Sequence, residues 1–404
     1  MKIAVLGYGT VGSGVVEVLE KNQELIAGRA GESIEVKYVL ARRDYPDDEI
    51  QERIVHDFQV ILQDDEIEIV VEALNGTEPA YTYVKSAILA GKHVVTPNKA
   101  LVAEHGVELL KLAKEKNLNF LFEASVAGGI PILRALQSSL TAEDIEEVAG
   151  ILNGTTNYMI TKMFCDGADY AEVLKEAQEK GFAEADPTAD VEGHDACRKI
   201  AILASIITGK FVDYREIYTE GISNISVEDM MYARELGMTI KLLAICKKNC
   251  HSVHASVAPV LLKNDHPLYP VNGVFNAVFV KGNMLGDAMF YGGGAGKLPT
   301  ASAVVADVIA VTKNREQDIM NTWTAEKVEL QDKSSICRRF LVRVKGNQEE
   351  HGKQIQDRFG EVSFVKPEGI SDEFGFVTTK MSEAEYEEKA KAFDCIQHML
   401  RIEE

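Results

Sequence analysis

The sequence predicts an α/β protein in three parts: a doubly wound parallel sheet, an α+β domain behind it, and a small βαββαβ tail. Three observations lead to this fold class. An apolar segment at residues 2–6 runs directly into a glycine-rich turn and a helical pattern, further strand–turn–helix units follow, and a second alternation of strands and helices begins after about residue 335. Strands that alternate with helices in this way are typical of parallel sheets covered by helices.

Length, charge and cysteine usage limit the class of protein. With 404 residues the chain is too long for one ordinary core and should hold two or three domains. Its formal net charge of −20 argues against nucleic acid or an anionic membrane as partner, since both are polyanions. We find no signal peptide, no apolar run long enough to span a bilayer and no framework spacing among the six cysteines. We therefore expect a cytoplasmic protein with reduced thiols.

The turn after the first strand carries a clear motif. Gly7-Tyr8-Gly9-Thr10-Val11-Gly12 lies between the strand at residues 2–6 and a helical pattern over 13–25. In this context GxGxxG predicts a Rossmann-type dinucleotide site. Gly7 permits the tight turn, Gly9 lets a pyrophosphate approach the backbone, and Gly12 lets helix and strand pack closely. The helix N-terminus then offers its free N–H groups to the phosphates.

The end of the second strand bears on which dinucleotide is bound. The strand predicted over residues 34–41 is followed by Arg42-Arg43-Asp44. An acid here usually binds the ribose 2′-OH of NAD, whereas an arginine accommodates the 2′-phosphate of NADP. The arginines come first, so the sequence favours NADP, and Asp44 leaves NAD open.

The carboxyl ends of the later strands should lie at the same edge of the sheet as the carboxyl end of the first strand. Strands predicted at 68–73, 92–96 and 119–124 end in Leu74-Asn75-Gly76-Thr77, in Pro97-Asn98-Lys99 and in the turn 125–131. Ligands of open α/β sheets bind at the carboxyl ends of the strands. We therefore expect Lys99 to point into the cofactor crevice, although a solvated lysine at a helix start has the same local sequence.

The segment from Gly181 to Lys199 gathers acids around one lysine. The apolar run from Ile200 predicts a buried helix, and Asp195 and Lys199 are spaced i,i+4 near its start. A lysine ringed by acids at that place is suited to holding a small polar molecule and moving a proton. Taken alone, a solvated acidic loop with one weak surface ion pair fits as well. The acids are Glu184, Asp186, Asp190, Glu192 and Asp195.

The middle of the chain is predicted to be α+β. A strand from about residue 146 leads into the polar turn 153–157 and a helix. We expect a helix around 229–248, strands at 254–262, 274–281 and 285–291, and an apolar helix from about 299 that packs back on the first domain. Cys246-x3-Cys250-His251 resembles half of a zinc site, but without a second pair these are predicted to be structural residues.

Six segments in order give a specific family resemblance. They are GYGTVG, VVTPNKALVA, FEASVAGGIPI, GILNGTTNYM, GFAEADPTADVEGHDACRK and GGGAGKLPTASAVVADVI. Together they resemble homoserine dehydrogenase over roughly residues 1–320. The resemblance implies reversible reduction of L-aspartate 4-semialdehyde to L-homoserine with NADPH or NADH, in the route to threonine, isoleucine and methionine. It also implies a homodimer or homotetramer.

The resemblance assigns roles to residues. Lys199 is the leading proton donor, directly or through water, and Lys99 is its electrostatic partner or relay. Substrate binding is implied for Glu184, Asp190, Asp195 and Thr155, and cofactor binding for Gly7, Gly9, Thr10, Val11, Gly12, Arg42, Arg43, Asn75, Lys99 and Gly296. A structural monovalent cation, expected to be sodium, would bind backbone carbonyls of Glu123, Val126, Gly128 and Ile130.

Two positions depart from the family pattern, and the tail departs from the pattern of the module that it resembles. Leu74-Asn75-Gly76 stands where many relatives have two glycines, and Phe182 where a tyrosine is frequent. The tail resembles an ACT domain, a small-molecule regulatory module, with strands over 338–346, 361–366, 373–381 and 400–404 and helices over 351–359 and 382–399. Its usual Asp-x-Pro-Gly turn is replaced by GNQEEHG. Control by an amino acid such as threonine and a purely dimer-forming or stabilising tail therefore both stay open.

The expected domains are 1–130, completed by a returning helix at about 298–320, then 131–297 and 335–404. Two other functions fit the sequence less well. An aspartate-semialdehyde dehydrogenase needs a nucleophilic cysteine, and Cys197 is expected to face a helix core. A silent amino-acid sensor should have lost Lys99 or Lys199 and kept the ligand turn of its tail, and the sequence shows the opposite.

Overall fold

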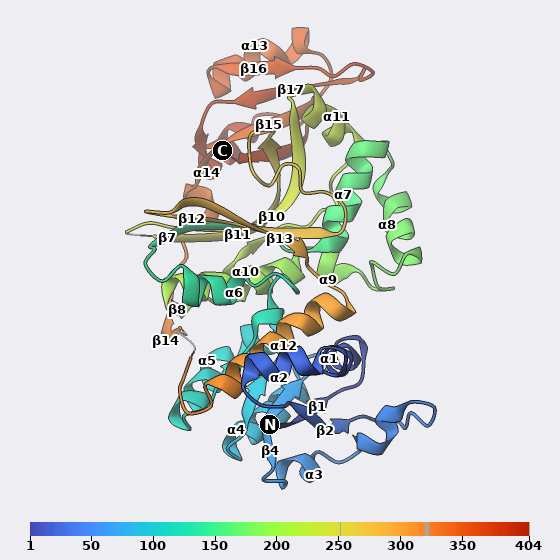
Figure 1. The fold of residues 1–404 in the computed structure, drawn as a ribbon. Coiled ribbons are helices and arrows are strands. Elements are labelled where there is room, and N and C mark those ends of the chain that lie inside the picture. The colour runs from blue at the N-terminus through green and yellow to red at the C-terminus, as the bar shows by residue number, and fades with distance from the viewer. Residues whose placement is uncertain (251, 320–322, 404) are drawn as a thin grey trace. The chain divides into compact units, whose positions relative to one another are not determined.

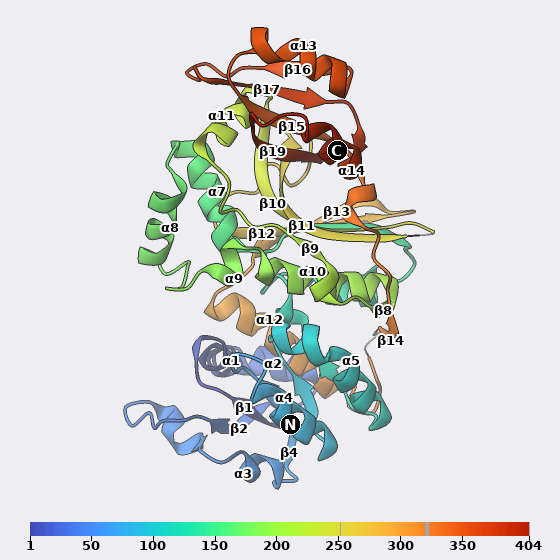
Figure 2. The same ribbon diagram turned by 180° about the vertical axis from the view of Figure 1, so that it is seen from behind.

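A computed structural model describes residues 1–250, 252–319 and 323–403, which form two compact units. The first unit comprises Met1–Asp144, Ala201–Tyr214 and Phe290–Val328, and the second holds the rest of the chain, including the tail. Figures 1 and 2 show the elements of each unit from opposite sides. In the described ranges no helix has both the length and the apolar character that a membrane span requires. The division into three domains stays a prediction.

The first unit is built on a six-stranded sheet in which every neighbouring pair is parallel. The strand order is β3-β2-β1-β4-β5-β6. Successive strands run outwards on opposite sides of β1, so the carboxyl ends of β1 and β4 flank the point where the chain changes direction, which is where such sheets bind ligands. The strands are β1 (Lys2–Leu6), β2 (Glu35–Leu40), β3 (Ile54–Val55), β4 (Ile67–Glu72), β5 (His93–Val95) and β6 (Phe120–Leu121).

The helix predicted over 13–25 begins earlier, at Thr10, and is interrupted at Asn22. The strand predicted over 119–124 is shorter, because a 3-10 turn occupies Glu123–Ser125. The helices of this unit are α1 (Thr10–Lys21), α2 (Gln23–Ala30), α3 (Phe58–Leu62), α4 (Ala80–Leu89), α5 (Lys99–Glu115), α6 (Ile132–Arg134) and α12 (Lys297–Lys313). A small separate sheet pairs β8 (Lys210–Phe211) with β14 (Thr324–Lys327).

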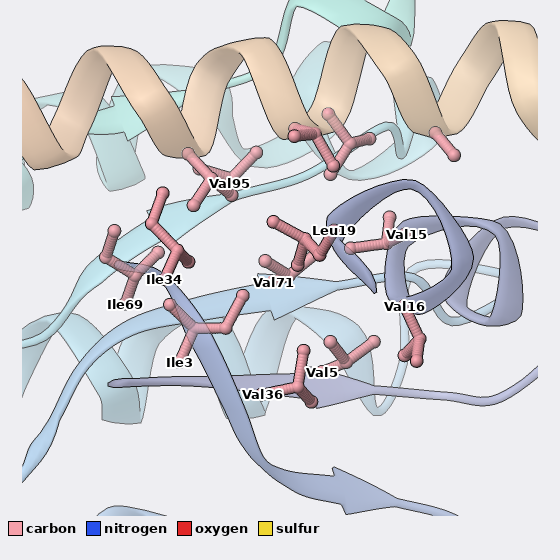
Figure 3. Packing of buried hydrophobic residues seen from close by; sticks show 14 of the residues in the cluster. Ile3, Val5, Val15, Val16, Leu19, Ile34, Val36, Ile69, Val71 and Val95 are labelled. Carbon is pink, nitrogen blue, oxygen red and sulfur yellow. The ribbon is translucent and has the colours of Figure 1, made fainter. Parts of the chain in front are cut away.

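Helix α12 completes the core of the first unit, as predicted from its apolar sequence. It contacts α1 and α2 and covers β4 and β5, and Figure 3 shows apolar side chains of the strands and of α1 packed beneath it. The approach to α1 is close, since a Cβ on Gly14 would lie 2.8 Å from the carbonyl oxygen of Lys297. The helix ends at Lys313, and residue 320, the predicted end, lies outside the described residues.

The second unit contains one large sheet with the order β13-β12-β7-β10-β11-β19-β15-β17-β16. Helix α7 (Gly154–Asp166) packs on this sheet and α8 (Tyr170–Glu179) packs on α7 (Figure 1). The other helices before the tail are α9 (Thr188–Val191) and the start of α10 (His194–Thr208). The strands that precede the tail are β7 (Ile145–Ile151), β9 (Tyr218–Thr219), β10 (Met238–Lys248), β11 (Val253–Lys263), β12 (Phe275–Gly282) and β13 (Gly286–Gly293).

The helix predicted around 229–248 is wrong beyond its first turns. A helix, α11, covers Val227–Glu235, but Met238–Lys248 is strand β10. This strand pairs with β7 on one side and β11 on the other, and it is buried on both faces from Met238 to Cys246. A strand buried on both faces has no alternating polar side, so its apolar run cannot be told from a buried helix by periodicity.

The tail has the predicted order of its main elements, with differences in their bounds. Its elements are β15 (Cys337–Lys345), α13 (Gln348–Phe359), β16 (Val362–Val365), β17 (Glu373–Thr378), the short β18 (Met381–Ser382), α14 (Glu383–Ala390) and β19 (Ile396–Glu403). The helix predicted over 382–399 ends at Ala390, and the last strand begins at Ile396, four residues before the predicted start. This strand lies between β15 and β11 and is parallel to β11, so the tail continues the sheet of the second unit. Glu404 lies outside the described residues.

Candidate active site

A cavity of about 780 Å³ lies at the carboxyl ends of β1, β2 and β4 in the first unit. Gly7 has φ +98°, which favours glycine, and a Cβ on Gly12 would lie 1.9 Å from the carbonyl oxygen of Gly7. Helix α1 begins beside the cavity without a side-chain cap, so its first N–H groups remain available to an anion. Of the predicted cofactor residues, those that line the cavity are Gly7, Gly9, Thr10, Val11, Arg42, Arg43 and Asn75.

The structure leaves three predicted cofactor residues outside this cavity. Gly12 supports the turn, Lys99 opens α5, and Gly296 precedes α12 with φ +114°. Three tyrosines that no sequence motif singles out also line the cavity: Tyr8, Tyr45 and Tyr83. A lone tyrosine gives no spacing signal. The Arg43 guanidinium lies 5.0 Å from the ring centroid of Tyr45.

The two arginines and the acid that follows them differ in their surroundings. Arg42 and Arg43 line the cavity, and Asp44 does not. The Asp44 carboxylate instead accepts a hydrogen bond from Gln51 at 3.0 Å and contacts the His56 ring at 3.1 Å. The bond from Gln51 and the His56 contact lower the pKa of Asp44. The residues present therefore fit a dinucleotide, with two guanidinium groups at the ribose end of the crevice.

A buried carboxyl group, Glu72, links the ends of β4 and β5, and sequence analysis did not single it out. It accepts hydrogen bonds from Thr96 Oγ1 at 2.5 Å and from the Leu74 backbone N–H at 2.6 Å. Thr96 in turn accepts from the backbone N–H of Asn98, whose side chain caps the helix that starts at Lys99. Burial raises the pKa of Glu72 to about 7. Its one sequence signal is an acid inside the apolar run EIVVEA.

In the second unit, Lys199 and Asp195 form a buried ion pair at the start of α10. Lys199 Nζ lies 2.6 Å from Asp195 Oδ2, and the side chains share one face of the helix as their spacing predicts. Only 8% of Lys199 and 5% of Asp195 are exposed. The ammonium also donates to the carbonyl oxygen of Leu152 at 2.6 Å. Two acceptors therefore fix the position of Nζ at the end of β7.

Asn153 joins this pair to the acidic loop. Its amide nitrogen donates to Asp190 Oδ1 at 2.7 Å and to Asp195 Oδ2 at 2.9 Å. Its amide oxygen accepts from the backbone N–H of Thr156 at 2.9 Å and so caps α7. The structure thus brings together Asp190, Asp195 and Lys199 around a residue that the sequence placed only in the polar turn 153–157.

The other predicted substrate residues lie in different surroundings. The hydroxyl of Thr155 donates to the carbonyl of Phe182 at 2.6 Å, which ties α7 to the acidic loop. Glu184 is exposed, and its carboxylate has no hydrogen bond or ion pair to a described residue. The Phe182 ring, 40% exposed, lies edge-on to Tyr158 with centroids 5.0 Å apart. Cys197 is buried, as expected for a residue facing the core.

The loop after β6 suits a hard cation. The carbonyls of Val126 and Gly128 are buried and accept no hydrogen bond from a described donor, whereas that of Ile130 accepts from Ile132 and that of Glu123 from Val126. Buried carbonyl oxygens without donors are the groups that bind such ions. Ala127 and Gly128 have φ +56° and +55°. A Cβ on Gly128 would lie 2.5 Å from the carbonyl oxygen of Gly294, which holds the loop closely.

Side chains offer no further metal centre in the described ranges, where no group of three His, Cys, Asp or Glu could hold an ion. Cys246 is buried and Cys250 is exposed, while His251 lies outside the described residues. Burial raises the pKa of Cys246 to about 12, which keeps it a thiol. All six cysteines are free.

Comparison with known proteins covers most of the chain. Residues 7–123 match the family model "Homoserine dehydrogenase, NAD binding domain" and residues 131–309 match "Homoserine dehydrogenase". Homoserine dehydrogenase of Bacillus subtilis is 44% identical over 317 residues, which are 78% of this chain and 73% of the relative. That of Corynebacterium glutamicum is 46% identical over 320 residues, 78% of this chain and 72% of the relative. The tail lies beyond both family models.

Solved structures extend the similarity to the full length. The crystal structure of a homoserine dehydrogenase from Thiobacillus denitrificans has a TM-score of 0.93 and 36% identity, and the comparison covers 100% of this chain and 98% of that chain. A hyperthermophilic archaeal homoserine dehydrogenase in complex with NADPH has a TM-score of 0.67 and 29% identity, with 77% of this chain and 98% of that chain covered.

Glu72→Gln is expected to remove a pH-dependent loss of stability. Glu72 has a pKa of about 7 in the fold against an ordinary value of 4.5. Between these values the unfolded chain binds fewer protons than the folded one, so this group lowers the free energy of unfolding as pH rises. Between pH 5 and pH 8 the free energy of unfolding of Glu72→Gln should rise by roughly 1–3 kcal/mol relative to that of the unsubstituted chain. Urea unfolding at both pH values measures this difference.

Glu24→Gln provides the control, because Glu24 is an exposed acid on α2 of the same unit. The free energy of unfolding of Glu24→Gln should equal that of the unsubstituted chain at both pH values. Parallel curves for Glu72→Gln and the unsubstituted chain would contradict the assignment of a raised pKa to Glu72.

Proposed function

The chain belongs to the homoserine dehydrogenase family, and we propose how its residues carry out the NAD(P)H-dependent reduction of L-aspartate 4-semialdehyde to L-homoserine. The observation that carries this proposal is the buried ammonium of Lys199, which Asp195 and the Leu152 carbonyl hold in place. Aldehyde reduction leaves negative charge on the carbonyl oxygen, and that oxygen needs a positive charge and a proton. Lys199 can provide both.

Lys199 is the proton donor of the proposed reaction, directly or through one water. When bound, the reduced nicotinamide supplies the hydride. Asp195 keeps the ammonium charged and oriented, since an opposite charge within hydrogen-bond distance favours the charged form. Burial strengthens the attraction between the ammonium and the developing alkoxide, because the local dielectric is lower than that of water.

The acidic loop provides the substrate amino group with its counter-charge. Asp190 is half-buried and linked to Asp195 by Asn153, so its carboxylate has a fixed position. Glu184 is exposed and has no described partner, which suits a residue that closes on the substrate. Thr155 positions the loop through its bond to the Phe182 carbonyl. We assign substrate binding to these residues and to Asp195.

Lys99 is proposed as the electrostatic partner or relay of Lys199. Support comes from its place at the first position of α5, after the carboxyl end of β5 and beside the network of Glu72, Thr96 and Asn98. That network ties the segment before Lys99 to Leu74, a residue of the cofactor cavity.

The cofactor is proposed to be NADP in preference to NAD. Arg42 and Arg43 line the cavity, whereas the carboxylate of Asp44 is occupied by Gln51 and His56. A 2′-phosphate could form charge-assisted hydrogen bonds with the two guanidinium groups. An NADPH complex is known for the archaeal relative named above.

Two further features are proposed. A sodium ion at the carbonyls of Val126 and Gly128, with Glu123 and Ile130, would stabilise the loop without taking part in the reaction. A second copy of the chain would cover the apolar side chains that β12, β13 and the turns beside them expose: Val274, Phe275, Met284, Leu285 and Met289. Sedimentation as a monomer would contradict this dimer. An amino-acid effector of the tail and a purely stabilising tail stay open.

Arg42→Ala and Arg43→Ala are expected to weaken the use of NADPH selectively. Each guanidinium removed should raise the KM for NADPH by about tenfold or more, since a hydrogen bond between charged groups contributes roughly 1.5–3 kcal/mol. The KM for NADH should change little. The measurement is oxidation of each cofactor with aspartate 4-semialdehyde as substrate.

Arg29→Ala is the matched control, because Arg29 is an exposed arginine on α2 outside the cavity. It should leave both KM values unchanged. If the unsubstituted protein turned over faster with NADH, the cofactor assignment would be wrong while the reaction would stand. No turnover with either cofactor in the presence of sodium would overturn the proposed function.

Lys199→Ala is expected to lower kcat by about 10²–10⁴-fold, the usual contribution of a positioned proton donor. The pH dependence of the remaining activity should also change. Lys175→Ala is the control, since Lys175 lies on α8 of the same unit and its side chain is 78% exposed. Near-normal turnover of Lys199→Ala with an unchanged pH profile would refute the role of Lys199, and circular dichroism should confirm that the variant is folded.

A further inference from the structure

A second cavity, of about 390 Å³, lies within the second unit at the place where the tail joins the large sheet. Its wall comes from the start of β7, from the end of β10 and the start of β11, from the end of β12, and from the tail strands β15 and β19. None of its lining residues belongs to the dinucleotide cavity or to the Lys199 cluster. The proposed reaction therefore gives this cavity no task.

The wall is cationic although the whole chain carries a net charge of −20. Five basic side chains line it against three acidic ones. The bases are Lys247, Lys248, Lys281, Arg338 and Lys380, and the acids are Glu146, Glu147 and Glu403. An excess of positive charge in a concave, partly enclosed place raises the local potential for anions.

The negative charges of the acids do not balance the positive charges of the bases evenly along the wall. Lys247 is paired with both Glu403 and Glu147, the second at 3.4 Å. Lys281 and Lys380 are exposed and form no ion pair with a described residue. The close ion pairs of the wall are therefore those of Lys247, and the exposed ammonium groups of Lys281 and Lys380 keep their positive charge.

Arg338 is the buried anchor of this wall. Only 11% of its side chain is exposed, yet its contacts to described residues are long: Nη1 lies 3.8 Å from Glu403 Oε2 and Nη2 lies 3.5 Å from His254 Nε2. A guanidinium has five N–H donors, and buried arginines normally form close, bidentate pairs. Burial also lowers the pKa of Arg338, the direction expected for a cation whose charge is incompletely compensated.

His254 does not provide a counter-charge for Arg338. Burial and the nearby Arg338 lower the pKa of His254 to about 4, against a smaller opposing effect of the Gln331 backbone, so the ring is neutral at neutral pH. A guanidinium only donates, so Nε2 must be the acceptor and Nδ1 carries the proton. Nδ1 is buried and has no hydrogen-bond partner among the described atoms. The ring therefore adds no negative charge that could balance the guanidinium.

We propose that this cavity binds a small oxyanion, a phosphate or carboxylate group, with the Arg338 guanidinium as its principal partner and Lys281 and Lys380 at the mouth. Arginine beside lysine is the usual combination for such groups, because the planar guanidinium binds two oxygens at once and the ammonium adds charge. The cavity volume lies within the range of small-molecule sites. The inference does not depend on the proposed reaction.

The test is a calorimetric titration of the full chain with inorganic phosphate and, separately, with succinate, at constant ionic strength. Saturable binding should weaken about tenfold or more in Arg338→Gln, which loses a charged hydrogen-bonding group. Lys380→Gln changes an exposed residue, so it should fold normally and weaken binding about threefold. Lys111→Gln, at a lysine whose side chain is 74% exposed in the first unit, should bind like the unsubstituted chain.

The two anions distinguish the source of the oxyanion group. Tighter binding of phosphate would assign the site to phosphates, and tighter binding of succinate would assign it to carboxylates. The proposal fails if neither anion saturates. It also fails if Arg338→Gln and Lys380→Gln both bind like Lys111→Gln, or if NADPH displaces the anion while Lys380→Gln leaves its affinity unchanged, since the anion would then lie in the dinucleotide cavity.

Discussion

The side chain of Asn153 is the constraint on which the site of the second unit depends. Its amide nitrogen donates to Asp190 and to Asp195, while its amide oxygen accepts from the backbone N–H and the hydroxyl of Thr156. Only an amide offers two donors and an acceptor oxygen in this arrangement. An aspartate here would place a third carboxylate against two others and would lack both donors. One residue therefore sets the start of α7, the position of the acidic loop and the orientation of the acid that holds Lys199.

Burying an ammonium group inside a protein costs desolvation free energy unless the group is paired and hydrogen-bonded. Lys199 meets this condition through Asp195 and the Leu152 carbonyl. Asp195 lies in the first turn of α10, where the helix dipole favours a negative charge. Helix α9, which carries Asp190, has a further attachment at its last residue, because Ile222 donates its backbone N–H to the Val191 carbonyl. The segment just before Ile222 is tied to the tail by the ion pair between Glu220 and Arg401, 2.6 Å long.

Local chemistry made the first sheet and much of the site predictable. The glycine turn, the ends of β1, β2 and β4 and the i,i+4 spacing of Asp195 and Lys199 are short-range signals, and the structure has each of them in place. Strand β6 ends earlier than predicted. Long-range burial was not predictable. Residues 238–248 were predicted to be helical because β10 is buried on both faces by segments distant in sequence. The last strand was predicted to be too short because the partners of β19, strands β11 and β15, lie far back along the chain. Glu72 was missed for the same reason, since its partner Thr96 directly follows another strand, β5.

The junction of the tail with the large sheet has a consequence for shortened forms of this protein. Strand β19 covers one side of β11 through the pairing of Val260–Leu262 with Arg401–Glu403. Any truncated chain that ends before β19 would leave the backbone N–H and C=O groups of that stretch exposed along an apolar strand. Such an edge is a template for pairing with another chain. Genetic or proteolytic removal of the tail would therefore create a self-associating, aggregation-prone surface, and the properties of a truncated protein would not isolate the activity of the catalytic region.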